Sequence, residues 1–428
     1  MKRFYLLSII LILINISCNK VENGESNDKT EIWRPALSSI RDDSSVRLFW
    51  LNPVIYEMIL RPFTYIDPDR FEIYMSQGDS KHLVKIADFD NDKKYSYKIT
   101  NLTNGLNYFI AVKAIKRGKE PLMSDTIMVI PSVPEIIQQL TDNTGFPMES
   151  GSISKDNQMI AYVNRNFTWD NGKYGDMSLF ALNLSSKENL IIDTSSYFPD
   201  WSPTEKKVVY CSDKHEITNA NGRPQHLLIY DFSTGTRIKL TNGDYFDINP
   251  DFSPDGNWIV YSSDEGQHGI FNFWKISKDG SQKTKITDNL NLTSLSIGNV
   301  ALGRPLWSSE GNSIFFNILS ENDSHNGIFQ INLQNGNINP IIKSQWKDMC
   351  PSASPDNNSI AFVSNRSGNN QIWVYNLSTK LFRQITGSKG TNLNTDWGKI
   401  EWINNQRLLY SGYSYTDSKE TIFTIDLK

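Results

Sequence analysis

The chain has 428 residues, of which 39% are hydrophobic, 12% aromatic and 21% charged, and its formal net charge is −4. This is the composition of a folded protein, because disordered chains have few aromatics and a larger net charge. The charge excludes the basic footprint of a protein that binds nucleic acid. One long apolar run lies at the N-terminus, so a membrane protein with several spans is also excluded.

The first segment is predicted to be a targeting signal. Lys2 and Arg3 precede an apolar run from Phe4 to Ile14, and Ser17-Cys18 follows. A basic start, a short apolar core and a small residue before the cleavage site are typical of a secretory signal peptide, here residues 1–17. The cysteine after Ser17 resembles the bacterial lipobox, which implies lipidation of Cys18 and attachment to a membrane. The alternative is an ordinary signal peptide with an incidental cysteine.

The next residues, 18–33, are polar and show no apolar period, so we expect a flexible tether. Asn19 follows the cysteine, where an Asp retains many lipoproteins at the inner membrane. The expected location is therefore the bacterial cell envelope, lipid-anchored at the outer membrane. The sequence leaves open whether the protein faces the periplasm or the cell surface.

Residues 34–132 are predicted to form a β-sandwich. Short alternating strands include Val46–Trp50 and Phe71–Met75. Leu102-Thr103-Asn104-Gly105-Leu106-Asn107-Tyr108 precedes another alternating strand and resembles a tyrosine corner, in which the phenol bonds to upstream backbone. Together with Trp50 and Tyr74, this pattern resembles a fibronectin type III domain. Such a domain is expected to act as a spacer or a docking surface.

The rest of the chain contains an internal repeat. Pro199-Asp200-Trp201-Ser202-Pro203 and Pro250-Asp251-Phe252-Ser253-Pro254-Asp255-Gly256 each precede an apolar strand, and weaker copies occur elsewhere. The aligned serines lie at 154, 202, 253, 308 and 354, which gives steps of 48, 51, 55 and 46 residues. This period is close to that of β-propeller blades, which have four strands each.

The repeat, with Leu-Thr or Ile-Thr closing several units, resembles the TolB-like, WD-type repeat of six-bladed β-propellers. The predicted fold class is thus all-β: a fibronectin type III sandwich followed by a six-bladed propeller over residues 134–428. The last unit is one strand short, and 135–141 carries the signature of a fourth strand. We expect this segment to complete the last blade and close the ring.

A ligand site is expected on one face of the propeller, called here the distal face. It is the face from which the loops between second and third strands and the blade-to-blade crossovers emerge. Loops on a rigid scaffold commonly carry function, and aromatic side chains in them can stack on sugars or anchor a protein partner. The candidate ligand-binding residues are Trp169, Tyr174, Tyr245, Phe246, Trp346, Trp397 and Tyr413.

Four histidines, His215, His226, His268 and His325, fall in loops of three adjacent blades. Imidazole is a common metal ligand, and Gln225-His226 and Gln267-His268 resemble the histidine and glutamine metal site of oligogalacturonate lyase. The preferred interpretation is exposed loop histidines, so no metal and no cofactor is predicted. No catalytic residue is assigned either, because templates such as the Gly-x-Ser-x-Gly elbow are missing.

The sequence therefore predicts a cell-envelope lipoprotein that presents a non-catalytic propeller for binding an unidentified envelope protein or glycan. The alternative is a polysaccharide lyase or hydrolase that acts at the distal face. The metal dependence of such an enzyme would involve His226 or His268. A role in the Tol–Pal system does not carry over, because this chain has a sandwich where TolB has an α/β domain. The partner and the oligomeric state are left open.

Overall fold

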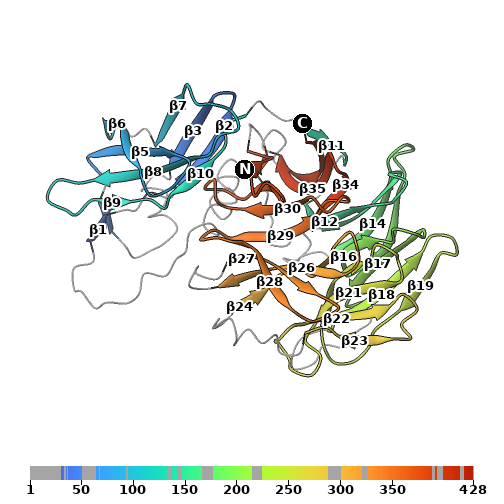
Figure 1. The fold of residues 1–428 in the computed structure, drawn as a ribbon. Coiled ribbons are helices and arrows are strands. Elements are labelled where there is room, and N and C mark those ends of the chain that lie inside the picture. The colour runs from blue at the N-terminus through green and yellow to red at the C-terminus, as the bar shows by residue number, and fades with distance from the viewer. Residues whose placement is uncertain are drawn as a thin grey trace. The chain divides into compact units, whose positions relative to one another are not determined.

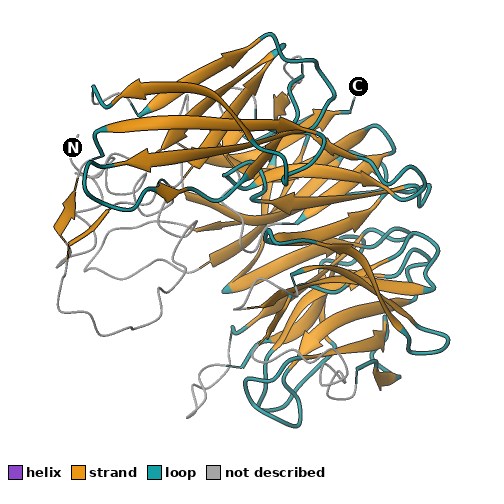
Figure 2. Cartoon of the chain, turned by 60° about the vertical axis from the view of Figure 1, so that its left-hand side comes forward, coloured by secondary structure: helices purple, strands orange, loops and turns teal. Residues whose placement is uncertain are grey.

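The computed structural model describes most of the chain after residue 29, with several gaps. The described residues are 30–32, 35, 37–50, 64–66, 68–92, 95–132, 137–141, 146–165, 177–214, 224–287, 300–320, 326–387, 391–392, 399–414 and 419–427. Within them every regular element is a β-strand (Figure 2). None of these residues forms a helix that is long and apolar enough to cross a membrane.

The chain divides into two compact units. One contains the residues up to Pro134 with two short loops, Asn365–Gln371 and Thr386–Gly390, and the other contains the remainder. Each unit is described separately below.

The first unit contains a sandwich of two antiparallel sheets, with a short parallel pair beside it. One sheet is β2 (Leu37–Asp42), β3 (Ser45–Trp50) and β7 (Ser96–Thr100). The other is β10 (Ile127–Val129), β8 (Tyr108–Ile115), β5 (Arg70–Gln77) and β6 (Val84–Asp90), with β9 (Leu122–Met123) paired to β8. The parallel pair is β1 (Thr30–Ile32) and β4 (Thr64–Ile66).

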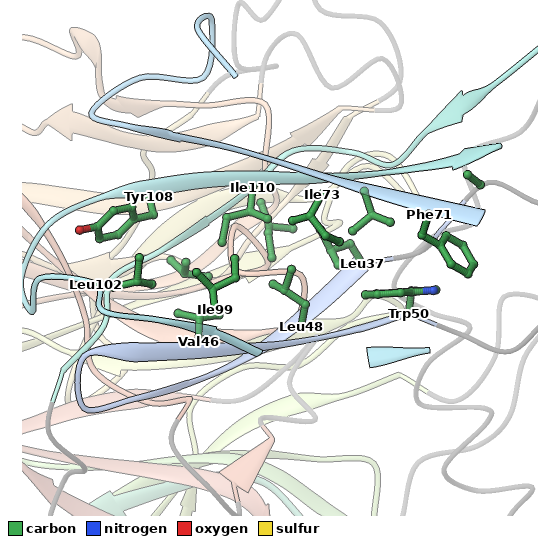
Figure 3. Packing of buried hydrophobic residues seen from close by; sticks show 14 residues of the cluster. Leu37, Val46, Leu48, Trp50, Phe71, Ile73, Ile99, Leu102, Tyr108 and Ile110 are labelled. Carbon is green, nitrogen blue, oxygen red and sulfur yellow. The ribbon is translucent and has the colours of Figure 1, made fainter. Parts of the chain in front are cut away.

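Alternation along these strands builds the sandwich core, since every second side chain points inward. Figure 3 shows Leu48 and Trp50 of β3 facing Ile73 and Phe71 of β5. The Trp50 and Phe71 rings lie 5.1 Å apart between centroids. At the other end, the Tyr108 hydroxyl accepts a 2.9 Å hydrogen bond from the Thr103 amide, which fixes the turn before β8.

The second unit is a β-propeller of six antiparallel sheets, numbered here as blades 1 to 6. Blade 1 is β12 (Phe146–Ile153), β13 (Met159–Arg165), β14 (Met177–Asn183) and β15 (Asn189–Thr194). Blade 2 is β16 (Ser196–Trp201), β17 (Lys207–Ser212), β18 (His226–Asp231) and β19 (Thr236–Lys239). Blade 3 is β20 (Asp247–Phe252), β21 (Trp258–Ser263), β22 (Asn272–Ser277) and β23 (Lys283–Lys285).

In blades 4 and 6 the first strand is split in two. Blade 4 is β24 (Val300–Leu302) and β25 (Leu306–Trp307), then β26 (Ser313–Ser320), β27 (Gly327–Asn332) and β28 (Ile338–Lys343). Blade 5 is β29 (Asp348–Ala353), β30 (Ser359–Ser364), β31 (Gln371–Asn376) and β32 (Phe382–Gln384). Blade 6 is β33 (Thr391–Asn392) and β34 (Ile400–Asn404), then β35 (Arg407–Ser414), β36 (Lys419–Asp426) and β11 (Ile137–Gln139).

The last blade takes its outer strand from the start of the propeller. β11 pairs antiparallel with β36, with Ile137 opposite Ile425 and Gln139 opposite Phe423. In Figure 1, β11 lies close to the other strands of blade 6, β34 and β35. The first and last blades also share an apolar cluster that includes Ile153 and Ile422. The ring is therefore closed by strand pairing and by side-chain packing.

The repeat serine makes the same two hydrogen bonds in blades 1, 3 and 5. Ser154, Ser253 and Ser354 each accept the amide of the residue five positions later, at 2.9 to 3.0 Å. The same hydroxyls donate to an aspartate two residues on, at 2.5 to 2.6 Å. In these three blades the turn between the first two strands is thus held by one serine and one aspartate, as Asx and Ser turn chemistry favours.

Candidate functional site

The first strands of blades 2, 3 and 5 carry a β-bulge at equivalent positions. The pairing register shifts between Tyr197 and Asp200, and again between Ile248 and Asp251. Within these bulges Phe198 and Asn249 have left-handed φ values of 52° and 57°. A bulge bends a strand and re-aims a side chain, and non-glycine residues at positive φ are uncommon. These bulges are therefore a specific structural feature of the propeller, and they define one level along its axis.

At this level lies a buried group of charged residues from four blades, and we call it the axial cluster: Asp200, Asp251, Arg304, Lys399 and Glu401. The Lys399 ammonium contacts Asp200 Oδ1, and lies 3.5 Å from Asp251 Oδ1 and 3.6 Å from Glu401 Oε2. These carboxylates come from blades 2, 3 and 6. One ammonium can meet strands from blades so far apart only near the centre of the ring.

The cluster is nearly closed to solvent, and its acids are perturbed accordingly. The Lys399 side chain is 5% exposed and that of Glu401 is 21% exposed. Burial, with the Asp200 charge nearby, raises the pKa of Asp251 to about 6 against the opposing effect of Lys399. Burial also raises the pKa of Glu401 to about 7. Protonation of both acids therefore changes between weakly acidic and neutral pH.

For Lys399, in contrast to the two acids, the pKa shift favours the charged form. Burial by itself would lower its pKa, but the carboxylates of Asp200, Glu401 and Asp251 hold the pKa above its ordinary value. The ammonium is therefore charged throughout the physiological range, and its charge is balanced by acids from three blades.

The same carboxylates bind neighbouring blades through backbone amides. Asp200 Oδ2 accepts the Phe252 amide at 2.7 Å, and Asp251 Oδ2 accepts the Trp307 amide at 2.9 Å. Glu401 Oε2 accepts the Ile153 amide at 3.3 Å, which links blade 6 to blade 1. The acids are thus engaged in holding the ring together.

Sequence reasoning missed this cluster, although a signal for part of it existed. Asp200 and Asp251 occupy the same place in their repeats, before the aromatic residue and the serine. We interpreted these positions as repeat and turn chemistry, whereas in the structure they face the propeller axis. Lys399 and Glu401 lie in the degenerate sixth unit, where the repeat pattern is too weak to assign an equivalent position.

Among the predicted distal-face residues, Tyr245 and Phe246 lie in the crossover from blade 2 to blade 3. The Phe246 amide donates to Asp264 Oδ1 at 2.7 Å, and Phe246 bridges to Gln225 at the end of the neighbouring loop. The half-buried Tyr245 ring lies edge-on to His226, with 6.4 Å between ring centroids. The crossover and a loop between second and third strands are therefore in contact on the distal face.

Lysines cover the aromatics of this region. Lys283 Nζ lies 5.6 Å from the centre of the Tyr245 ring and 5.0 Å from that of Trp274. Trp274 was not among the predicted residues, because it lies within β22 rather than in a loop. Gly243 allows the Tyr245 ring to lie against the backbone. Its φ is 123°, and a Cβ at this position would come 2.3 Å from the ring.

The other predicted aromatics are less informative. Trp346 lies in a different crossover, between blades 4 and 5, where its amide donates to Ser344 Oγ at 3.2 Å. Tyr413 is placed as backbone in β35, but its side chain is outside the described residues. Trp169, Tyr174 and Trp397 are outside them too, as is the lipidation candidate Cys18.

Two of the four histidines are described, and they are unlike one another. His226, expected in an exposed loop, begins β18 and is 1% exposed, with Nδ1 3.7 Å from Asp247 Oδ2. His268 is 46% exposed, with Nδ1 3.7 Å from Asp264 Oδ2. His215 and His325 lie outside the described residues. Within the described part of the chain, no three His, Cys, Asp or Glu side chains gather as metal ligands would.

No protein-family model matches the chain. Curated relatives match only segments of it. An uncharacterized protein of Agrobacterium fabrum, Atu1656, is 32% identical over 94 residues, which cover 22% of this chain and 29% of that protein. The uncharacterized peptidase YuxL of Bacillus subtilis is 26% identical over 128 residues, covering 29% of this chain and 18% of the peptidase. The chain thus spans less than a third of these relatives.

Solved structures match over more of the chain. TolB from Acinetobacter baumannii is 17% identical, with 76% of this chain and 77% of that chain covered and a TM-score of 0.45. An oligogalacturonate lyase in complex with manganese is 12% identical, with 92% and 97% covered and a TM-score of 0.44. The described residues of the protein form an all-β structure with a β-propeller. The functions in the neighbours' names are not carried over to it.

Proposed function

We propose that this chain is a lipid-anchored protein of the bacterial cell envelope whose propeller binds a protein or a glycan at the distal face without acting on it chemically. The observation that carries the proposal is the contact between the crossover of Tyr245 and Phe246 and the neighbouring loop at Gln225. It gathers half-buried aromatics and lysines on the face where a propeller presents its loops.

The anchor in this proposal rests on the sequence. Lys2 and Arg3, the apolar run and Ser17-Cys18 support export and lipidation, and Asn19 supports the outer membrane. The sandwich would be a fibronectin type III module that separates propeller and membrane. The hydrogen bond between Tyr108 and the Thr103 amide supports that assignment, because a tyrosine corner makes such a bond.

Catalysis is the alternative, as a polysaccharide lyase or hydrolase at the same face. Two features favour binding instead. The buried acids of the axial cluster are occupied by Lys399 and by backbone amides. His226 is buried against Asp247, where substrate contact is restricted.

Photo-crosslinking in intact bacterial envelopes tests the binding site. A benzophenone amino acid at Phe246 should crosslink to the partner. The product should be a single additional protein band if the partner is a protein, or a heterogeneous carbohydrate smear if it is a glycan. The same probe at Thr234, an exposed residue in the turn on the opposite face, is the matched control. Equal capture at both positions would contradict a distal-face site. New reducing or unsaturated ends in a captured glycan would favour the enzyme.

The anchor is tested separately by metabolic labelling with an alkyne fatty acid. The full chain should be labelled, and Cys18→Ala should lose the label and leave the membrane fraction. Continued labelling of Cys18→Ala would contradict lipidation at this residue, whatever the crosslinking shows.

A further inference from the structure

Arg304 is a buried cation with unpaired hydrogen-bond donors. The residue is 6% exposed, and Nη2 donates to the Pro250 carbonyl at 2.9 Å. Nε and Nη1 are buried and have no hydrogen-bond partner. Buried polar groups are nearly always paired, and leaving a charged donor unpaired is costly. The guanidinium therefore lacks an acceptor that its position requires.

The contrast with Lys399 shows what that acceptor is. In the repeat, Glu401 and Leu306 occupy equivalent positions of blades 6 and 4. Lys399 and Arg304 each lie two residues before that position, in Lys399-Ile400-Glu401 and Arg304-Pro305-Leu306. Blades 2, 3 and 6 place Asp200, Asp251 and Glu401 at this position, and all three face Lys399. Blade 4 places Leu306 there. Arg304 thus has no carboxylate at the equivalent position of its own blade.

The carboxylates already present do not fill the gap. Asp251 is the acid whose charge acts on Arg304, but its Oδ2 accepts the Trp307 amide and its Oδ1 faces Lys399. On another side the guanidinium carbon lies 6.0 Å from the centre of the Phe198 ring. An aromatic wall excludes water and strengthens a charge-assisted hydrogen bond to an anion.

We propose that Arg304 anchors an anion-binding site on the propeller axis, and that its ligand is a small carboxylate held by the guanidinium donors that the protein leaves unpaired. A carboxylate is the class favoured, because a planar guanidinium matches two coplanar oxygens and because carboxylates occupy the equivalent position in three other blades. The site lies apart from the distal-face crossover and does not depend on the proposed function.

The test uses the full chain in detergent, with formate as the probe. Thermal unfolding is followed as sodium formate replaces sodium chloride at constant ionic strength. Formate should raise the unfolding temperature of the wild type, since a ligand that binds only the folded state stabilises it. Arg304→Met should weaken the apparent affinity by about tenfold or more, because it removes charge-assisted hydrogen bonds.

Arg237→Met is the matched control, because Arg237 is 44% exposed on the outer strand of blade 2. It should keep the wild-type response to formate. An equal response in Arg304→Met and the wild type would overturn the proposal. If Arg304→Met does not fold, wild-type crystals soaked in sodium bromide decide: anomalous density within hydrogen-bond distance of the guanidinium is expected, and its absence would overturn the site.

Discussion

The surroundings of Lys399 differ from what its position in the chain suggests. It lies in the degenerate part of the repeat, yet its ammonium is buried among Asp200, Asp251 and Glu401. A buried charge is tolerated only when it is paired, and removing one partner leaves the others uncompensated. The residue scale therefore carries two predictions, one on charge and one on pH.

Lys399→Met should destabilise the propeller strongly. The substitution leaves buried carboxylates without their cation, which costs about 3–5 kcal/mol in comparable cases. Urea unfolding at pH 7 measures the effect. Lys278→Met is the control, because Lys278 pairs with Glu205 at the surface, where an ion pair contributes about 0–1 kcal/mol. A similar small loss in both variants would contradict the assigned role of Lys399.

Stability should fall as the pH rises through the range in which the axial acids lose their protons. In the unfolded chain Asp251 and Glu401 titrate near 3.8 and 4.5, whereas in the folded protein their pKa values are about 6 and 7. The folded state therefore binds more protons between these values, and its stabilisation is complete below the unfolded pKa values and lost through the folded ones.

Urea midpoints measured from about pH 5 to pH 8 give the slope that this linkage predicts. Glu401→Gln should flatten the pH dependence, because the amide does not titrate. An unchanged slope in Glu401→Gln would show that other groups dominate the response.

At the scale of the element, the turn between the first and second strands explains why the repeat is visible in the sequence. In blade 3 the Ser253 hydroxyl accepts the Trp258 amide, and Gly256 follows with a φ of 69°. Left-handed backbone costs an L-residue about 1–2 kcal/mol, so the turn favours glycine, or asparagine as at Asn157 and Asn357. The residues that recur in the repeat are therefore those that the backbone of this turn requires.

Gly256→Ala should destabilise more than Gly235→Ala. Both glycines have nearly the same φ, 69° and 70°, so both pay the same backbone strain. A Cβ on Gly256 would lie 2.2 Å from Thr204 Oγ1, whereas a Cβ on Gly235 meets nothing within 4 Å. Thermal unfolding measures the loss of stability in each variant. The difference between the two losses gives the effect of the Cβ contact with Thr204 of blade 2, because the backbone strain is common to both. Equal losses would mean that Thr204 simply moves away.

At the scale of the whole molecule, we expect stability to depend on the closure of the ring by β11. β11 completes blade 6, and Thr141 adds a 2.7 Å contact between its hydroxyl and that of Thr421. The Leu140 amide donates to the Ile422 carbonyl at 2.8 Å. Without this strand the edge of β36 would be exposed, and an exposed edge invites pairing with other chains.

Replacing Glu135–Thr141 by a Gly/Ser segment of equal length should open the ring. We expect a loss of unfolding temperature of more than about 10 °C, since each kcal/mol corresponds to about 2–4 °C in a domain of this size. The same replacement in the predicted tether, 20–26, should leave the unfolding temperature unchanged. A wild-type temperature in the first variant would contradict closure by β11.

The sequence by itself determined the class of fold. Alternation along Val46–Trp50, the regular spacing of Ser154, Ser202, Ser253, Ser308 and Ser354, and the turn chemistry after them are local properties that the backbone imposes. They are legible without knowing which segments meet. Even the strand that closes the ring could be predicted, because one fourth strand was missing and one surplus strand lay upstream.

Only the tertiary structure decided which charged residues meet. Asp200 and Lys399 are 199 positions apart, and Asp251 comes from a third blade. Their meeting depends on the curvature of the ring and on the bulges in the first strands of blades 2 and 3, and neither leaves a short-range pattern. The burial of His226 was missed for the same reason: the sequence pattern predicts it in an exposed loop, whereas it begins β18 and the packing of blade 2 on blade 3 covers it.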